Sequence, residues 1–290
     1  MPLNPLVILG SLAAAAMVSV GAASLSGLLA NPSGNTIPIA ETVILAPGSF
    51  MHPRPGEFLK DGHPVAAPLI PADIRNPVEI MKYQVSAQEY ERCVEAAACE
   101  PVDKPGHGDQ PVTGVSHIDA EAYVAWYSHA TGQSWRLPSD QEWAYAAAER
   151  FTADIEGGKS DPANPAVRWL AQYRTESALD RKPDPTPRTR GSFGVNSKGV
   201  ADTAGNVWEW TSTCYVHAVV ARDGTSVESA IDNCGVSVVE GFHRTYMSNF
   251  IRDGKSGGCA VGTPPDNLGF RLVRDQPSFA RSVMRRLGIS

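Results

Sequence analysis

Two carboxylates stand seven residues apart on either side of a glycine, at Asp202 and Glu209 around Gly205. Carboxylate oxygens and the backbone carbonyls of a tight loop are the ligands that a hard cation such as Ca²⁺ prefers. This spacing therefore predicts a calcium site. The alternative is a hydrogen-bonded turn that holds no metal.

A second group of polar side chains follows His243. Tyr246, Met247 and Asp253 make this segment polar and partly redox-capable. An imidazole beside a carboxylate can bind a harder metal such as iron, or it can act as a general base. The alternative is a surface histidine with ordinary hydrogen bonds and no chemical role.

The chain has five cysteines, which suit an oxidising compartment. Cys93 and Cys99 stand six residues apart at the end of an expected helix, so a small local disulfide loop is predicted. Cys214 and Cys234 bracket a polar stretch that resembles a stapled loop. Spacing does not determine connectivity, so both pairings are predictions. Cys259 is left over, and its thiol could be buried, reactive or intermolecular.

Three helices that could position these groups begin with similar caps. Each has a serine followed three residues later by an acidic side chain, the pattern of a capping box. The pairs are Ser86 with Glu89, Ser116 with Asp119, and Ser139 with Glu142. In the second helix an apolar stripe predicts a buried face, and His117 in its first turn is expected to be exposed. Elsewhere short strands, at 42–45, 78–80 and 270–273, and long loops are expected, with a surface excursion over the proline-rich residues 151–200.

The N-terminus predicts export. No charged side chain precedes Glu41, and residues 6–30 form an apolar run of 25 residues, long enough to span a bilayer. Residues 1–30 are therefore read as a signal peptide or as a retained membrane anchor, with a buried hydrophobic helix as the alternative. Residues 31–41, with proline, serine, glycine and asparagine, are read as a linker. The expected location is periplasmic or otherwise extracytoplasmic.

Composition and charge exclude several classes of protein. Hydrophobic residues make up 42% of the chain and charged residues 19%, which is ordinary globular usage and not that of a disordered or collagen-like chain. With 25 Lys and Arg against 31 Asp and Glu, the formal charge is −6. A mildly acidic chain without a long basic run is a poor nucleic-acid binder, so no nucleic-acid partner is expected.

Six strings, in chain order, resemble motifs of the formylglycine-generating enzyme (sulfatase-modifying factor) domain. They lie at residues 46–50, 81–90, 111–116, 136–143, 204–211 and 267–272. The resemblance implies a loop-rich α+β fold related to C-type lectins over residues 42–275, followed by a tail at 276–290. Carried over from the family, the calcium ligands would be the side chains of Asp202 and Glu209 and the carbonyls of Gly205 and Val207.

The catalytic part departs from the family pattern. The family's oxidase uses two cysteines, whose thiolates bind Cu(I) because both are soft. The corresponding segment, residues 240–253, contains no cysteine, and the two positions fall near His243 and Ser248. Trp208 corresponds to a tryptophan near the family's oxygen pocket. We therefore take His243, Ser248 and Trp208 as candidate catalytic residues and expect formylglycine generation by the copper-dithiolate route to be lost.

Two functions remain open at this point. The first is an exported, oxidoreductase-like or maturation factor that acts on a peptide or small molecule, with iron or copper as a conceivable cofactor. The second is a non-catalytic accessory or binding module, for example for a nitrite reductase, that docks a partner protein in the periplasm. Residues 6–30 could tether either one to a membrane. A redox metal at His243 would favour the first function, and calcium alone would favour the second.

Overall fold

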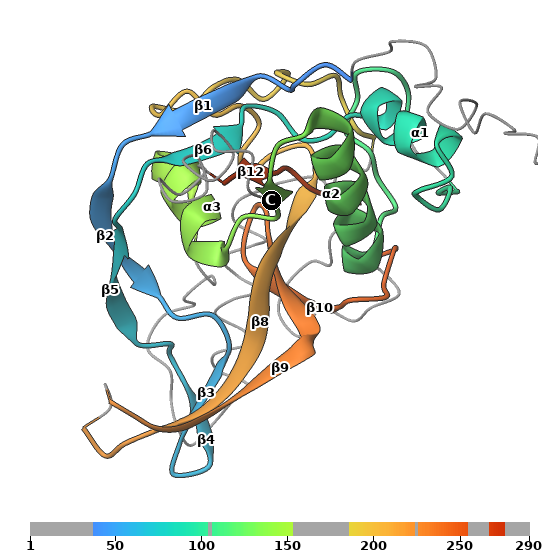
Figure 1. Cartoon of the computed structure of the whole chain (residues 1–290). Coiled ribbons are helices and arrows are strands. Elements are labelled where there is room, and N and C mark those ends of the chain that lie inside the picture. Colours follow the sequence, from blue (N-terminus) through green and yellow to red (C-terminus); the bar gives the residue numbers. More distant parts are fainter. Residues whose placement is uncertain (1–36, 104–105, 153–185, 224–225, 255–266, 276–290) are drawn as a thin grey trace, which may run out of the picture. The chain divides into compact units, whose positions relative to one another are not determined.

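A four-stranded antiparallel sheet joins the two ends of the domain. In the computed structural model, which describes residues 37–103, 106–152, 186–223, 226–254 and 267–275, this sheet has the order β1-β6-β12-β7. The strands are β1 (Thr42–Leu45), β6 (Val78–Met81), β12 (Val273–Arg274) and β7 (Trp135–Arg136). All four residues of β6 are buried, which suits a strand with neighbours on both edges. β12, the last strand in the described part of the chain, therefore lies inside the sheet (Figure 1).

A second sheet is built around a long hairpin. Its order is β10-β9-β8-β3-β4, and β11 pairs with β8 in parallel. The strands are β3 (Glu57–Lys60), β4 (His63–Val65), β8 (Trp208–Val220), β9 (Val227–Glu240), β10 (Thr245–Ser248) and β11 (Leu268–Gly269). A separate two-stranded ribbon pairs β2 (Gly48–Pro53) with β5 (Leu69–Ile74). Figure 1 shows the distal halves of β8 and β9 extending away from the helices.

The three predicted helices are confirmed, together with their caps. They are α1 (Ala87–Glu95), α2 (His117–Thr131) and α3 (Asp140–Ala147), the last followed by a 3-10 turn at Ala148–Arg150. Each has a complete capping box, in which the serine hydroxyl accepts from the N3 amide and the N3 carboxylate accepts from the serine amide. Helix α2 ends at Gly132 in the left-handed conformation, with φ of 65°.

The main core is aromatic and lies against α2. The Tyr123 ring stacks on Tyr90 and Tyr127, with ring centroids 5.9 and 5.5 Å apart, and Phe270 meets its edge. The predicted apolar stripe of α2 is buried, as expected. His117 is a correction, because its side chain is only 14% exposed and its ring contacts Trp210 edge-on. Burial against β8 lowers the pKa of His117.

Both predicted disulfides are confirmed, but one lies in a different structure from that expected. Cys93–Cys99 closes the end of α1, and Cys214–Cys234 joins β8 to β9. The stretch between Cys214 and Cys234 is a hairpin of long strands, 13 and 14 residues, and not a polar loop between short strands. The residues of β9 from Glu228 to Gly235 are all exposed, so the alternation that marks a half-buried strand is missing there.

The expected strand at 270–273 is confirmed only at Val273. The side chains of Phe270 and Leu272 are buried, and their carbonyls accept hydrogen bonds from Val85 and Met81 outside the regular ladder. Within the described ranges no helix is long and apolar enough to cross a membrane. The predictions for residues 1–36, 153–185, Cys259 and 276–290 concern residues outside the described part of the chain.

Candidate functional site

The turn predicted to bind calcium has a strained backbone. Three non-glycine residues within it have positive φ: Asp202 at 56°, Ala204 at 54° and Asn206 at 68°. Such conformations cost free energy and persist where the surroundings over-determine them. The Asp202 carboxylate accepts from the backbone amides of Gly191 (2.5 Å) and Phe193 (2.8 Å). This aspartate therefore holds the preceding loop against the turn.

Glu209 is fully buried and is bound by four protein donors. Arg271 donates to it from Nε (2.5 Å) and Nη2 (2.7 Å), Trp143 from its indole nitrogen (2.9 Å) and Gln84 from its amide (2.8 Å). A carboxylate has about four acceptor positions, so these donors saturate it. Arg271 also donates to the backbone carbonyls of Met81, Lys82 and Ala201, as expected for an arginine between apolar neighbours.

These contacts bear directly on the calcium prediction. The carboxylates of Asp202 and Glu209 both serve protein donors, and the Gly205 carbonyl accepts from the Val207 amide. In this arrangement a calcium ion could reach the predicted ligand set of Asp202, Gly205, Val207 and Glu209 only by displacing those donors. Among the described residues, no three His, Cys, Asp or Glu side chains gather as metal ligands. Calcium binding itself stays a prediction.

Two of the three candidate catalytic residues meet at the start of β8. The ring of Trp208 contacts Phe242 (centroids 5.0 Å apart) and His243 (5.8 Å), both edge-on. We call these three residues the Trp208 group. Trp208 is 6% exposed, and its amide donates to the Asn267 carbonyl. Its indole N–H has no hydrogen-bond partner within the described structure. The group therefore combines aromatic walls with one imidazole.

The protonation pattern of the His243 ring follows from one contact. Its Nδ1 lies 2.9 Å from the backbone carbonyl of Arg244, and a carbonyl only accepts. Nδ1 therefore carries the proton in the neutral ring, and the lone pair is on Nε2, the atom of a base or a metal ligand. His243 is 6% exposed, so the alternative of a surface histidine is wrong.

Ser248 lies elsewhere. It is the last residue of β10, opposite Val236 of β9, whereas His243 precedes the first residue of β10. A strand rises roughly 3.3 Å per residue, so about 10 Å of strand separates the two ends of β10. The structure thus brings His243 to Trp208 and places Ser248 at the far end of the strand.

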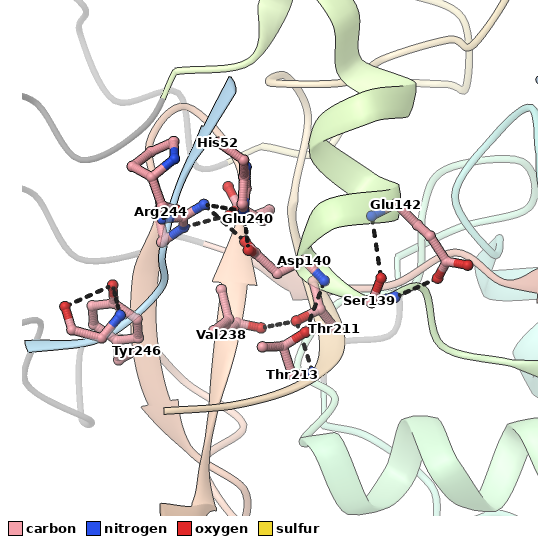
Figure 2. A network of polar contacts seen from close by, with 12 residues as sticks. His52, Ser139, Asp140, Glu142, Thr211, Thr213, Val238, Glu240, Arg244 and Tyr246 are labelled. Atoms are coloured by element: carbon pink, nitrogen blue, oxygen red, sulfur yellow. Dashed lines mark hydrogen bonds and ion pairs between the residues drawn. The ribbon is translucent and has the colours of Figure 1, made fainter. Parts of the chain in front are cut away.

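Sequence reasoning missed a buried charge cluster beside this group (Figure 2). It consists of His52 from β2, Asp140 from α3, Glu240 from β9 and Arg244, and each is at most 1% exposed. Arg244 contacts Glu240 (2.8 Å) and Asp140 (3.0 Å), and His52 contacts Asp140 at 2.5 Å. The spacing of Glu240 and Arg244, four residues apart with a glycine between them, was a weak local indication of this ion pair. The contacts of His52 span 88 and 192 residues, which no local pattern reveals.

Opposite pKa shifts accompany the two carboxyl groups of the cluster. Burial raises the pKa of Glu240 well above its usual value, the neighbouring Asp140 adds to the rise, and Arg244 opposes it. Burial also acts to raise the pKa of Asp140, but Arg244 and hydrogen bonds from Glu240 and His52 outweigh it and lower that pKa to about 2. When two carboxyl groups share one positive partner, their pKa values move apart in this way.

The Trp208 group depends on a glycine. A Cβ at Gly241 would lie 2.4 Å from the Trp208 ring, closer than real contacts allow. We expect Gly241→Ala to lower the free energy of unfolding by about 1–3 kcal/mol, because the indole is fixed by β-pairing and has to shift. Urea unfolding and near-ultraviolet circular dichroism measure the two effects. Gly235→Ala in the exposed part of β9 is the matched control, and equal losses in both variants would contradict the prediction.

Comparison with known proteins identifies the family of the domain. The model of the sulfatase-modifying factor enzyme 1-like domain matches residues 29–276. A formylglycine-generating enzyme of Mycobacterium tuberculosis (strain ATCC 25618 / H37Rv) is 35% identical over 116 residues, 38% of this chain and 35% of that protein. An inactive Cα-formylglycine-generating enzyme 2 of Bos taurus is 28% identical over 187 residues, 58% of this chain and 53% of that protein.

Among solved structures, that of PvdO from Pseudomonas aeruginosa is similar in fold. Its TM-score is 0.51 at 24% identity, and the match covers 82% of this chain and 95% of that one. The matches to the two curated relatives span only about a third and about a half of those proteins. The family model, in contrast, extends over nearly all of the described residues. The chain therefore belongs to the family of the sulfatase-modifying factor enzyme 1-like domain, and it has the mixed α+β, loop-rich fold of that family.

Proposed function

We propose that this protein is an exported, periplasmic member of the family that acts on a peptide or small molecule without copper-dithiolate chemistry. The number and the pairing of the cysteines are the main support for the proposal. Of five cysteines, four form Cys93–Cys99 and Cys214–Cys234, so only Cys259 remains. One thiol cannot supply the two thiolates of a Cu(I) site. The family fold is thus kept while the oxidase's ligand pair is missing.

The proposed reaction centre is the Trp208 group. His243 occupies the neighbourhood of one missing cysteine, and its ring contacts Trp208. The Nε2 lone pair suits a general base or a ligand for a metal harder than Cu(I), such as iron. A substrate would lie over Trp208 and residues 240–254. We therefore propose oxidoreductase-like maturation chemistry, in which both the His243 imidazole and the aromatic rings of Trp208 and Phe242 have a role.

Export is supported by the disulfides and by the N-terminal sequence. Two disulfides are typical of an oxidising compartment, and the apolar residues 6–30 suit a signal peptide or a tether. Calcium at the Asp202 turn remains part of the proposal, with the requirement that the ion displace protein donors from Glu209. Metal analysis therefore tests both halves of the proposal.

The test uses the full chain, exported into the periplasm of a bacterial host and purified without chelator. We expect no formylglycine from a cysteine peptide that formylglycine-generating enzyme converts, with or without Cu(I). We also expect a stoichiometric redox metal, measured by mass spectrometry, that disappears in His243→Ala. His217→Ala, an exposed histidine paired with Glu57, is the control. Copper-dependent conversion, or metal content unchanged in His243→Ala, would overturn this assignment.

One observation favours the second candidate function, a docking module. Ile118 at the start of α2 and Phe250 after β10 are 61% and 71% exposed, and the Ile118 amide lies 3.4 Å from the carbonyl next to Phe250. Two large apolar side chains exposed on neighbouring backbone segments suit a protein contact. Calcium as the sole bound metal, with loss of partner binding in Phe250→Ser, would support docking over catalysis.

A further inference from the structure

The buried charge cluster has more negative than positive groups. The single guanidinium of Arg244 faces two carboxyl groups, Glu240 at 2.8 Å and Asp140 at 3.0 Å (Figure 2). All three side chains are at most 1% exposed. If both carboxyls were ionised beside a neutral His52, the interior would hold a net negative charge. Burying an uncompensated charge is costly, so one more proton is needed.

The hydrogen-bond pattern indicates where that proton resides. Glu240 Oε2 is buried and has no hydrogen-bond partner among the described residues, and Asp140 Oδ1 has only the ion-pair contact with Arg244 Nη2 at 3.0 Å. A proton shared between the two groups serves both oxygens at once. The alternative position is Nδ1 of His52, which is also buried and has no acceptor beside it among the described residues. A proton on Nδ1 would gain no hydrogen bond, so Glu240 is the better site.

His52 contributes a second constraint. Its Nε2 lies 2.5 Å from Asp140 Oδ2 and 3.2 Å from Arg244 Nη2. The shorter contact requires a hydrogen, and the carboxylate that pairs with Arg244 only accepts when it is ionised. Nε2 therefore donates to Asp140. With Nδ1 bare, His52 is neutral and Asp140 is ionised. The cluster then contains one cation, one anion, one neutral histidine and one neutral carboxylic acid, and its net charge is zero.

The cluster is directly attached to the candidate reaction centre. Glu240 ends β9, Arg244 precedes β10, and Gly241, Phe242 and His243 lie between them. Arg244 also donates to the carbonyl of Pro53 in β2. The cluster therefore fixes both ends of the turn that presents His243 to Trp208.

We propose that Glu240 stays protonated in the folded protein at neutral pH, shares this proton with Asp140, and on losing it at alkaline pH loosens the turn that carries His243. Arg244 is thereby a positioning residue for His243. Any effect of this change on a reaction at His243 rests on the proposed function. The protonation of Glu240 and the loosening of the turn do not.

The pKa directions agree with this geometry. Among the described residues, the charged or titratable groups next to Glu240 are Arg244 from its own turn, Asp140 from α3 and, through Asp140, His52 from β2. Glu209 lies opposite Glu240 on β8, and its carboxylate is paired with Arg271. Burial first, and then Asp140, raises the pKa of Glu240. The folded state therefore binds a proton that the unfolded state has lost, and stability falls as pH rises above the ordinary range of a glutamate. Asp140, with its lowered pKa, costs stability only as pH falls toward about 2.

The first test measures stability against pH. Urea unfolding of the full chain is followed from about pH 5 to about pH 9 for wild type, Glu240→Gln and the control Glu228→Gln, an exposed residue of β9. One extra proton in the folded state lowers the folding equilibrium constant by up to about tenfold per pH unit. We expect this fall in wild type and in Glu228→Gln, and its loss in Glu240→Gln. An equal fall in all three proteins would overturn the proposal.

Two further measurements keep the proposal testable if Glu240→Gln does not fold. In wild type labelled with ¹³C at glutamate carboxyls, one carbon should keep the chemical shift of a protonated acid at neutral pH. Ionised shifts for every glutamate would overturn the assignment. Hydrogen exchange of residues 240–248, corrected for intrinsic rates, should rise at alkaline pH in wild type. None of these readouts needs a substrate or metal, so they stand apart from failure of the proposed function.

Discussion

Replacing Arg271 with methionine should lower the free energy of unfolding by about 3–5 kcal/mol. The guanidinium is fully buried, binds both oxygens of Glu209, and donates to three backbone carbonyls. Removing one partner of a buried ion pair leaves the other charge uncompensated, and this accounts for most of the cost. Urea denaturation of the full chain measures the effect.

Two companion variants separate charge from packing. Arg222→Met removes an exposed guanidinium and should change stability by less than about 0.5 kcal/mol. The double variant Arg271→Met, Glu209→Gln no longer has the uncompensated charge. It should therefore regain part of the free energy of unfolding that Arg271→Met loses. Trp143 and Gln84 donate to different oxygens of Glu209, so one of the two can still donate to the single amide oxygen of the glutamine. A loss below about 1 kcal/mol in the single variant would show that Glu209 has another cation, and calcium would be the first to test.

Replacing Arg244 with methionine should cost a similar amount, about 3–5 kcal/mol, and should also disturb the Trp208 group. The variant removes the guanidinium that faces both Glu240 and Asp140 in the interior. It also frees the turn at 241–243, so the near-ultraviolet circular dichroism of the tryptophans should change in the folded protein.

Arg244→Lys is the informative comparison. Lysine keeps the charge but lacks the planar fork that reaches Glu240, Asp140 and the Pro53 carbonyl together. We expect a smaller loss of stability than in Arg244→Met. A methionine variant as stable as wild type, with an unchanged tryptophan spectrum, would show that this turn is held by other contacts.

Local chemistry explains which parts of the fold were predictable. A capping box needs two residues three apart, so Ser86, Ser116 and Ser139 mark their helices from sequence. The stripe of α2 has a helical period, so its buried face was predictable as well. The length of β9 was not, because its residues 228–235 are all exposed and have no apolar face to produce alternation.

The site was predictable only in part, for a chemical reason. Asp202 and Glu209 suit a cation, and their sequence spacing cannot tell a metal ion from a guanidinium. The guanidinium that meets Glu209 lies 62 residues later, at Arg271. The family resemblance named Trp208 and His243 as candidate catalytic residues, whereas the charge cluster joins residues as far apart as His52 and Arg244, which no local pattern links. Side-chain identity limits what a group can bind, and only the fold selects its partner.

The position of β12 constrains when this domain can fold during synthesis. Val273 pairs with Ile80 on one side and with Arg136 on the other, so β6 and β7 are joined only through the end of the domain. A growing chain that has not yet reached residue 274 cannot complete this sheet. The ion pair between Glu209 and Arg271 cannot form before Arg271 has been synthesised. Such long-range pairing slows folding. The domain would thus stay open until residue 274 has been made, which would suit the export that we propose.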